Sequence, residues 1–275
     1  DARISRNNTV SALIRLNHAN AVLNNLTIQD GQNSIGSYAY GGGVTIVTHG
    51  GMVTNCIIRN NKITTYGGIG VGVNVSGPGI VTHCVITNNN CHDNADGLGG
   101  AVAVMHASGR VENCLVAFNT TDLSSTHLTK KVAGSAYISA GAIVNCTIVS
   151  NKSSLVGGIR TLGGTVQNCL VLGNKSSHAT ANVTNNVYYS SAAPFVRCLS
   201  DDLLINDACI LDAPGFTDAA FRIGPNSPAV DQGLLPTWGA EPTDLGLGPR
   251  VIHRKIDIGC YEAAWIPPGT VLILK

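Results

Sequence analysis

One stretch of the chain, residues 92–131, concentrates ionisable residues of types that could support acid–base chemistry. Paired carboxylates can exchange protons with a substrate or bind Ca²⁺, an imidazole can shuttle a proton, and a guanidinium or ammonium group can neutralise an acidic substrate. We therefore predict four catalytic residues in this stretch: Asp93, Asp96, His106 and Arg110. Five more residues are predicted to bind ligand: His92, Asp122, His127, Lys130 and Lys131.

The same stretch also has a structural interpretation, which the residue types favour. Asp93-Asn94-Ala95-Asp96-Gly97 is typical of a turn, and Lys130 and Lys131 are typical of a solvated loop. We expect no metal ion and no other cofactor; Ca²⁺ held by Asp93 and Asp96 is the alternative that stays open. The acidic residues near the end of the chain are expected to cap turns and pair with arginines: Asp231, Asp244, Asp257 and Glu262.

The composition indicates that short strands position these residues. Only 12% of the 275 residues are charged, the net charge is +1, and glycine occurs 32 times. A chain with so little charge is not a disordered polyelectrolyte, and we expect no nucleic-acid partner. Residues that favour turns outnumber good helix formers, so long helices are not expected. Apolar runs extend over a few residues, which excludes insertion into a membrane through a helix.

One sequence unit recurs along the chain. The unit has Gly five positions before its Cys, a β-branched residue three positions before it and usually Asn one position before it. After the Cys, a second β-branched residue follows two positions later and Asn five positions later. The copies are centred on Cys56, Cys84, Cys114, Cys146 and Cys169. Their spacings of 28, 30, 32 and 23 residues match one coil of a solenoid. Because β-branched runs alternate with Gly and Asn, the pattern predicts an all-β solenoid of about seven coils.

Stacked coils place identical residues in columns along the axis, about 4.8 Å apart. The cysteines would form one column, and we favour buried free thiols over disulfides because this spacing is too long for a disulfide. The asparagines would form a second column, in which side-chain amides bond from coil to coil: Asn61, Asn89, Asn119, Asn151 and Asn174. Strand alternation then sends an apolar row outward, which the tail or a flanking domain should cover: Ile57, Val85, Leu115, Thr147 and Leu170.

The last quarter of the chain differs from the coils. Prolines are frequent after residue 200, which favours a loop-built cover for the end of the solenoid. We expect coils over 1–200 and a cap over 201–275 that packs on them, together one structural domain. Basic residues exceed acidic ones before residue 200 and the reverse holds after it. A mildly basic solenoid of this kind would suit an acidic glycan.

The coil pattern and the tail together resemble a known group. Gly-Gly blocks followed by Asn-Cys and a terminal Asn resemble the right-handed parallel β-helix proteins of the pectate-lyase-like superfamily. Segments of the tail, including Ser227-Pro228-Ala229-Val230-Asp231 and Ile256-Asp257-Ile258-Gly259-Cys260, resemble the C-terminal signature of bacterial choice-of-anchor β-helix proteins. The resemblance implies a right-handed helix in an exported or surface-attached bacterial protein. It assigns no catalytic residues, and the end of this chain is too short and polar for a membrane anchor.

We therefore expect an exported, extracellular or cell-surface β-helix module that binds a polysaccharide or a cell-surface partner, within a longer protein with flanking domains. The first alternative is a polysaccharide lyase or glycoside hydrolase, whose relatives in that superfamily use a base with a charge-neutralising group or a pair of carboxylates. The shortage of carboxylates in the coils weighs against this alternative. The second alternative is a structural solenoid that associates with itself.

Overall fold

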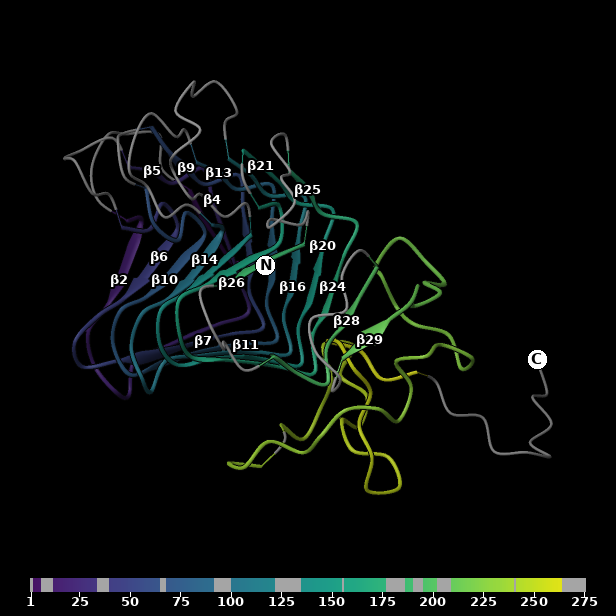
Figure 1. Ribbon diagram of the computed structural model, residues 1–275. Coiled ribbons are helices and arrows are strands. Elements are labelled where there is room, and N and C mark those ends of the chain that lie inside the picture. The colour runs from purple at the N-terminus through teal and green to yellow at the C-terminus, as the bar shows by residue number, and fades with distance from the viewer. Residues whose placement is uncertain are drawn as a thin grey trace, which may run out of the picture.

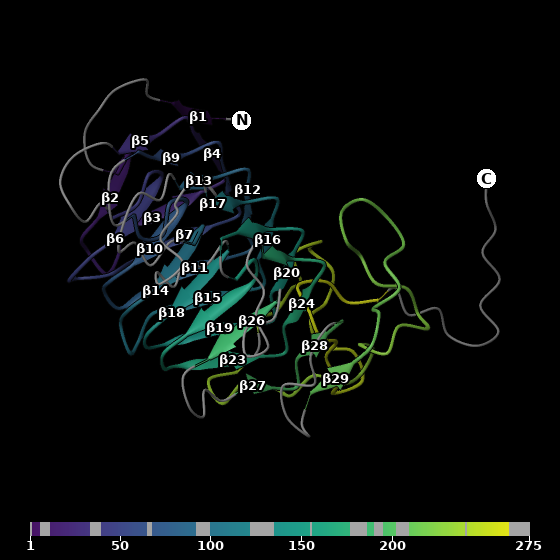
Figure 2. The ribbon, with the colours of Figure 1, turned by 45° about the horizontal axis from the view of Figure 1, so that its top comes forward.

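The computed structural model shows a parallel β-solenoid, as predicted (Figures 1 and 2). It describes residues 2–5, 12–33, 40–64, 68–91, 100–121, 135–154, 156–176, 186–189, 195–201, 209–239 and 241–263. These residues contain 29 short strands and no helix. Every strand pair in the solenoid is parallel, and the strands stack into four sheets.

Each coil passes through the four sheets in the order C, D, A and B. Sheet C contains β2 (Ile14–Leu16), β6 (Val44–Ile46), β10 (Val73–Val75), β14 (Val102–Val104), β18 (Ala136–Ile138), β22 (Ile159–Thr161) and β26 (Val187–Tyr189). Sheet D contains β3 (Val22–Asn24), β7 (Gly51–Thr54), β11 (Gly79–Thr82), β15 (Arg110–Glu112), β19 (Ala142–Val144), β23 (Thr165–Gln167) and β27 (Phe195–Val196).

The other two sheets complete the coil. Sheet A contains β1 (Ala2–Ser5), β4 (Leu26–Gln29), β8 (Ile57–Arg59), β12 (Val85–Thr87), β16 (Leu115–Ala117), β20 (Thr147–Val149), β24 (Leu170–Leu172), β28 (Leu199–Ser200) and β29 (Ile210–Leu211). Sheet B contains β5 (Gln32–Asn33), β9 (Lys62–Ile63), β13 (Asn90–Cys91), β17 (Thr120–Thr121), β21 (Lys152–Ser153) and β25 (Lys175–Ser176). Because sheet B holds six strands, complete coils are slightly fewer than the seven that we predicted.

Left-handed backbone conformations turn the chain between the strands. The residue before each cysteine of the repeat has a positive φ, from 49° at Asn113 to 53° at Asn168, and His83 takes this place with φ 52°. Asparagine is common there because it tolerates this conformation better than most side chains. The residue that follows each sheet A strand from β4 to β24 also has a positive φ, and at Phe118 a bulky residue adopts it with φ 57°.

The predicted cysteine column forms in the core. Seven cysteines stack along it, all of them buried free thiols: Cys56, Cys84, Cys114, Cys146, Cys169, Cys198 and Cys209. Each thiol of the repeat lies near the carbonyl two residues earlier, as in the 3.0 Å contact from Cys114 Sγ to Glu112 O. The thiols therefore act as small apolar side chains with a local hydrogen bond.

The predicted asparagine column also forms, and it is fully buried. In each step the backbone N–H and the side-chain amide of one asparagine donate to Oδ1 of the asparagine in the next coil. For Asn89 and Asn119 these distances are 2.9 Å and 3.0 Å. The column ends at Asn186, whose amide donates to Asp201 Oδ1 at 2.7 Å.

The tail lies against sheet A of the later coils (Figures 1 and 2). Ile223, Ile258 and Tyr261 form one apolar cluster with the outward side chains of that sheet. The outward row is therefore covered where the tail lies and open elsewhere: Leu170 is 1% exposed, whereas Ile57 is 40% exposed. The approach is close at Gly259, whose N–H donates to Asn168 O at 2.8 Å and where an added Cβ would lie 2.8 Å from Leu170.

Candidate functional site

Two of the nine predicted site residues lie in the described part of the chain. His106 lies in the turn between β14 and β15, where its Nδ1 accepts a hydrogen bond from Ser108 N at 3.1 Å. Arg110 begins β15, on the outer face of sheet D. The other seven predicted residues lie outside the described residues: His92, Asp93, Asp96, Asp122, His127, Lys130 and Lys131. Their roles remain predictions.

Arg110 lies in a cluster that the sequence did not reveal. Its Nε forms an ion pair with Glu112 Oε1, and its guanidinium lies over the indole of Trp238, 5.2 Å from the ring centroid. Glu112 is 2% exposed, and burial raises the pKa of its carboxyl, while Arg110 and a hydrogen bond from Trp238 lower it. The negative charge of Glu241, three positions after Trp238 in the chain, also raises this pKa.

Trp238 belongs to a segment of the tail that crosses sheet D, residues 234–239, which we call the arm. The backbone of Leu234 is fixed by Asn168, which accepts from Leu234 N at 2.9 Å and donates to Leu234 O at 2.7 Å. Gln167 donates to the same carbonyl at 3.0 Å. The backbone is thus anchored, yet the apolar side chains point to solvent: Leu234 is 43% exposed, Leu235 52% and Trp238 43%.

The arm continues into a second anchor on the solenoid. His83 Nε2–H donates to the carbonyl of Thr243 at 2.8 Å, and His83 Nδ1 lies 2.9 Å from Thr82 Oγ1. His83 is buried. Its contacts have a structural role, because they fix the end of the segment that carries Glu241.

The outer face of sheet D extends the exposed apolar surface beyond Arg110. The strand registers place Val22, Met52 and Ile80 in one row with Arg110, one residue per coil. Val22 is 55% exposed, and Met52 and Ile80 are half-buried. Neighbouring side chains in the row are about 4.8 Å apart, so an elongated ligand could contact several of them.

The carboxylates of the tail hold its own backbone. Asp244 accepts from Gly248 N at 2.8 Å and Glu262 N at 2.9 Å, and Asp257 accepts from Asp231 N at 2.8 Å. Arg250, fully buried, pairs with Glu262 Oε1 at 3.0 Å. Burial raises the pKa of Glu262 to about 8, with Asp257 adding to the rise and Arg250 opposing it. These contacts agree with the structural role expected for the acidic residues.

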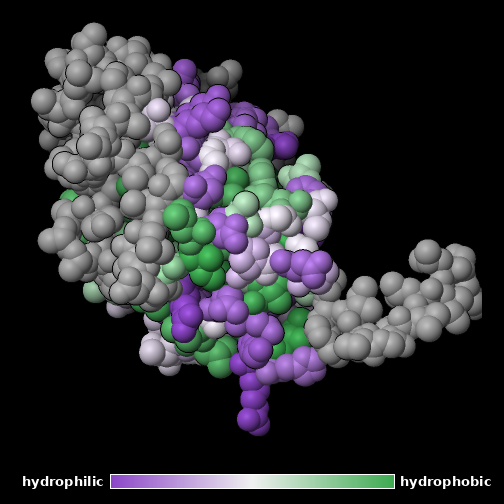
Figure 3. All heavy atoms as spheres, turned by 45° about the vertical axis from the view of Figure 1, so that its right-hand side comes forward, coloured by the Kyte–Doolittle hydropathy of each residue, from purple (hydrophilic) through white to green (hydrophobic). Residues whose placement is uncertain are grey.

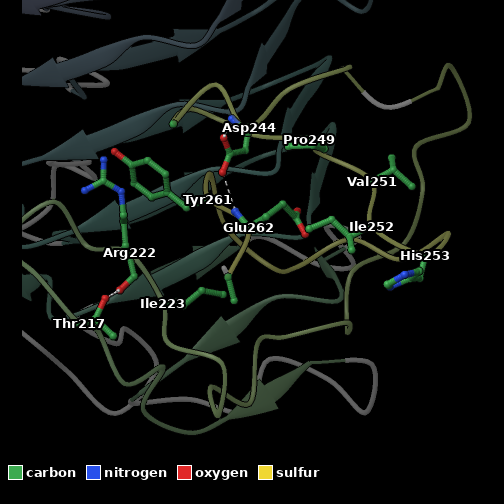
Figure 4. A pocket seen from close by; sticks show the side chains of 13 residues that line it. Thr217, Arg222, Ile223, Asp244, Pro249, Val251, Ile252, His253, Tyr261 and Glu262 are labelled. Carbon is green, nitrogen blue, oxygen red and sulfur yellow. Dashed lines mark hydrogen bonds between the residues drawn. The ribbon is translucent and has the colours of Figure 1, made fainter. Parts of the chain in front are cut away.

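The tail also encloses a groove of about 720 Å³ beside these carboxylates (Figure 4). Ile223, Tyr261 and Glu262 line one part of it, and Val251, Ile252 and His253 line the opposite part. On this side of the molecule hydrophobic and hydrophilic side chains are interspersed over the described surface (Figure 3). No pattern in the sequence predicts this groove, because its walls come from separate turns of an irregular segment.

Within the described residues there is no group of three or more His, Cys, Asp or Glu side chains that could hold a metal ion. Over the same part of the chain, no helix has the length and hydrophobicity needed to cross a membrane. Comparisons of this chain with protein-family models, with curated proteins and with solved structures each found no match.

Proposed function

We propose that this chain is a rigid β-helix module that is exported from a bacterial cell and binds a polysaccharide or a partner at the cell surface. The observation that carries the proposal is that the arm exposes three apolar side chains while its backbone is bonded to the solenoid. These side chains are Leu234, Leu235 and Trp238. Exposed apolar side chains gathered on a monomer commonly mark a binding surface. A fixed backbone lowers the entropy that binding must overcome.

The parallel solenoid supports the family-level part of this proposal. Its coils follow the pattern by which the sequence resembles pectate-lyase-like β-helix proteins, and the tail that packs on sheet A includes the residues that resemble the choice-of-anchor signature. Export to the cell surface, within a longer protein with flanking domains, follows from that resemblance.

Four carboxylates of the described residues are occupied by structural contacts, which favours binding over catalysis. Glu112 is buried beneath Arg110 and Trp238, and the carboxyls of Asp244, Asp257 and Glu262 accept backbone N–H groups of the tail. A general acid or base must reach the proton that it transfers. These carboxyls are instead used to hold the tail in place.

Affinity electrophoresis tests the proposal. The purified protein is run through native gels that contain one of several neutral or acidic polysaccharides, with a polymer-free gel as the control, and each gel is stained for protein and for polymer. We expect slower migration in at least one polymer without clearing of that polymer. Clearing would support the lyase or hydrolase instead. Unchanged migration in every gel would contradict polysaccharide binding.

A further inference from the structure

The surroundings of Trp238 indicate which class of polysaccharide the module binds. We infer that the exposed indole of Trp238 stacks against a sugar ring of an uncharged polysaccharide that lies across sheet D. This inference rests on the proposed function and assigns it a site and a ligand class. It departs from the acidic glycan that the charge distribution along the sequence suggested.

The indole provides a platform that suits the apolar face of a sugar. The negative face of an aromatic ring attracts C–H groups, and its flat area removes them from water. Trp238 is 43% exposed and lies beside the exposed Leu234 and Leu235 on the same arm. Met52 and Ile80 in the row of Arg110 provide further apolar contacts along the solenoid axis. A chain of sugar rings is an elongated ligand of the kind that such a row can contact.

The platform is fixed before any ligand arrives. Arg110 lies over the indole, and its own position is fixed by the ion pair with the buried Glu112. Asn168 and Gln167 fix the start of the arm through Leu234, and His83 fixes Thr243 beyond its end. Because both ends are held by different coils, stacking on Trp238 requires little ordering of the arm.

The charges around the platform favour an uncharged ligand. The single cation of the cluster, Arg110, is paired with Glu112, and Glu241 adds a negative charge nearby. At the other end of the arm Asp231 is paired with Lys255 at 3.0 Å. A uronate carboxylate would therefore find no unpaired cation in this cluster, and the carboxylate of Glu241, three positions after Trp238 in the chain, would repel it. The hydroxyl groups of an uncharged sugar are not repelled in this way.

The test compares the wild type with Trp238→Ala in gels of an uncharged polymer, hydroxyethyl cellulose or soluble xylan, and of polygalacturonate. We expect the uncharged polymer to slow the wild type, and the substitution to weaken this effect at least tenfold in apparent Kd. Polygalacturonate should leave both proteins unaffected. Trp238→Phe should retain part of the binding because it keeps an aromatic face. Leu211→Ala is the matched control, since Leu211 is 53% exposed on β29, away from sheet D.

A second readout does not depend on migration. The chain has two tryptophans, so Trp265→Phe leaves Trp238 as the single tryptophan. Its fluorescence should change on addition of the uncharged polymer and saturate at the Kd found in the gels. If Trp238→Ala lowers the urea midpoint, Leu235→Ser provides a second variant at a solvent-facing position.

The outcomes separate the inference from the proposed function. Binding of an uncharged polymer that Trp238→Ala leaves unchanged would overturn the site, while the proposed function would stand. Trp238-dependent binding of polygalacturonate would overturn the ligand class. A wild type that binds no polymer would overturn both.

Discussion

The side chain of Asn168 holds the backbone of Leu234 through two hydrogen bonds, one accepted at 2.9 Å and one donated at 2.7 Å. The two residues are 66 positions apart, and the pair fixes the arm to the corner between sheets D and A. Asn168 also bonds Asn145 Oδ1 at 2.8 Å, so the anchor continues into the preceding coil. The position before the cysteine turns the chain in every copy of the repeat, and at Asn168, as at His83, its side chain also binds the tail.

Replacing Asn168 by glycine should detach the arm without straining the coil. Asn168 has φ 53°, which glycine adopts readily, so the substitution removes only the side-chain bonds. We expect the free energy of unfolding in urea to fall by about 2 to 3 kcal/mol, at about 1 kcal/mol for each buried bond. Asn55→Gly is the control: it has φ 51° and one exposed bond to Asn24, so its effect should be smaller. Equal losses in both variants would contradict the anchor.

The asparagine column should be sensitive to a single change. Asn119 donates to Ile86 O at 2.9 Å and Asn151 Oδ1 at 3.0 Å, and accepts from Asn89. Asn119→Ala removes these bonds and leaves the buried backbone N–H of Asn89 without its acceptor, so unfolding should become easier by about 3 kcal/mol.

The neighbouring Asn90→Ala is the control for that change. Asn90 is half-buried and donates one side-chain bond, to Thr120 Oγ1 at 2.8 Å. Chemical denaturation of both variants should give a loss below about 1 kcal/mol for Asn90→Ala. A column that only fills space would instead give similar losses for the two variants.

Stability should decrease as the pH rises from about 4.5 to 8. Burial raises the pKa of Glu262 from its ordinary 4.5 to about 8, so the folded protein holds a proton that the unfolded chain has released over this range. The stabilisation is complete below pH 4.5 and is lost as the pH passes 8, on the order of 2 kcal/mol. Asp257, whose pKa burial also raises, contributes with the same sign.

Urea unfolding at several pH values checks this sign. Glu262→Gln cannot titrate and should flatten the dependence between pH 5 and 8. Asp218→Asn should leave it unchanged, because Asp218 is exposed and hydrogen bonds from Arg222 lower its pKa. An unfolding free energy that rises with pH over this range in the wild type would contradict the assignment.

The nine thiols should be inert until the protein unfolds. All of them are buried, so the reagent cannot reach them in the folded protein, and burial also raises the pKa of the Cys260 thiol to about 12. We expect Ellman's reagent to label none of them in the native protein and all nine in guanidinium chloride. Rapid labelling of several thiols in the native state would contradict the buried cysteine column.

The sequence predicted the coils because the same residue types recur at corresponding positions of each coil. Asn55, Asn113 and Asn145 occupy left-handed positions, and the following cysteines fill the same place in the core. Parallel pairing then follows from the spacing alone. The predicted number of coils was slightly too high, because the described residues contribute six strands to sheet B.

The tail contacts could not be predicted in the same way. His83 and Thr243 are 160 residues apart, and nothing repeats in the tail that would indicate its partner. Arg110 was identified as a candidate, yet its partners were not. Glu112 lies two positions away on the same strand face, a signal that alternation could have provided. Trp238 approaches from a segment with no regular structure, so only the folded chain reveals it.

The asparagine column has a direction. Every step donates toward the following coil, so the peptide and amide dipoles add along the axis, as they do in a helix. The donor end is the positive pole, and there Asn186 and Gly173 donate to Asp201. Asp201 thus has the role for the solenoid that an acidic N-cap has for a helix. The column therefore has a dipole along the solenoid axis from Asn61 to Asn186, although the net charge of the chain is only +1.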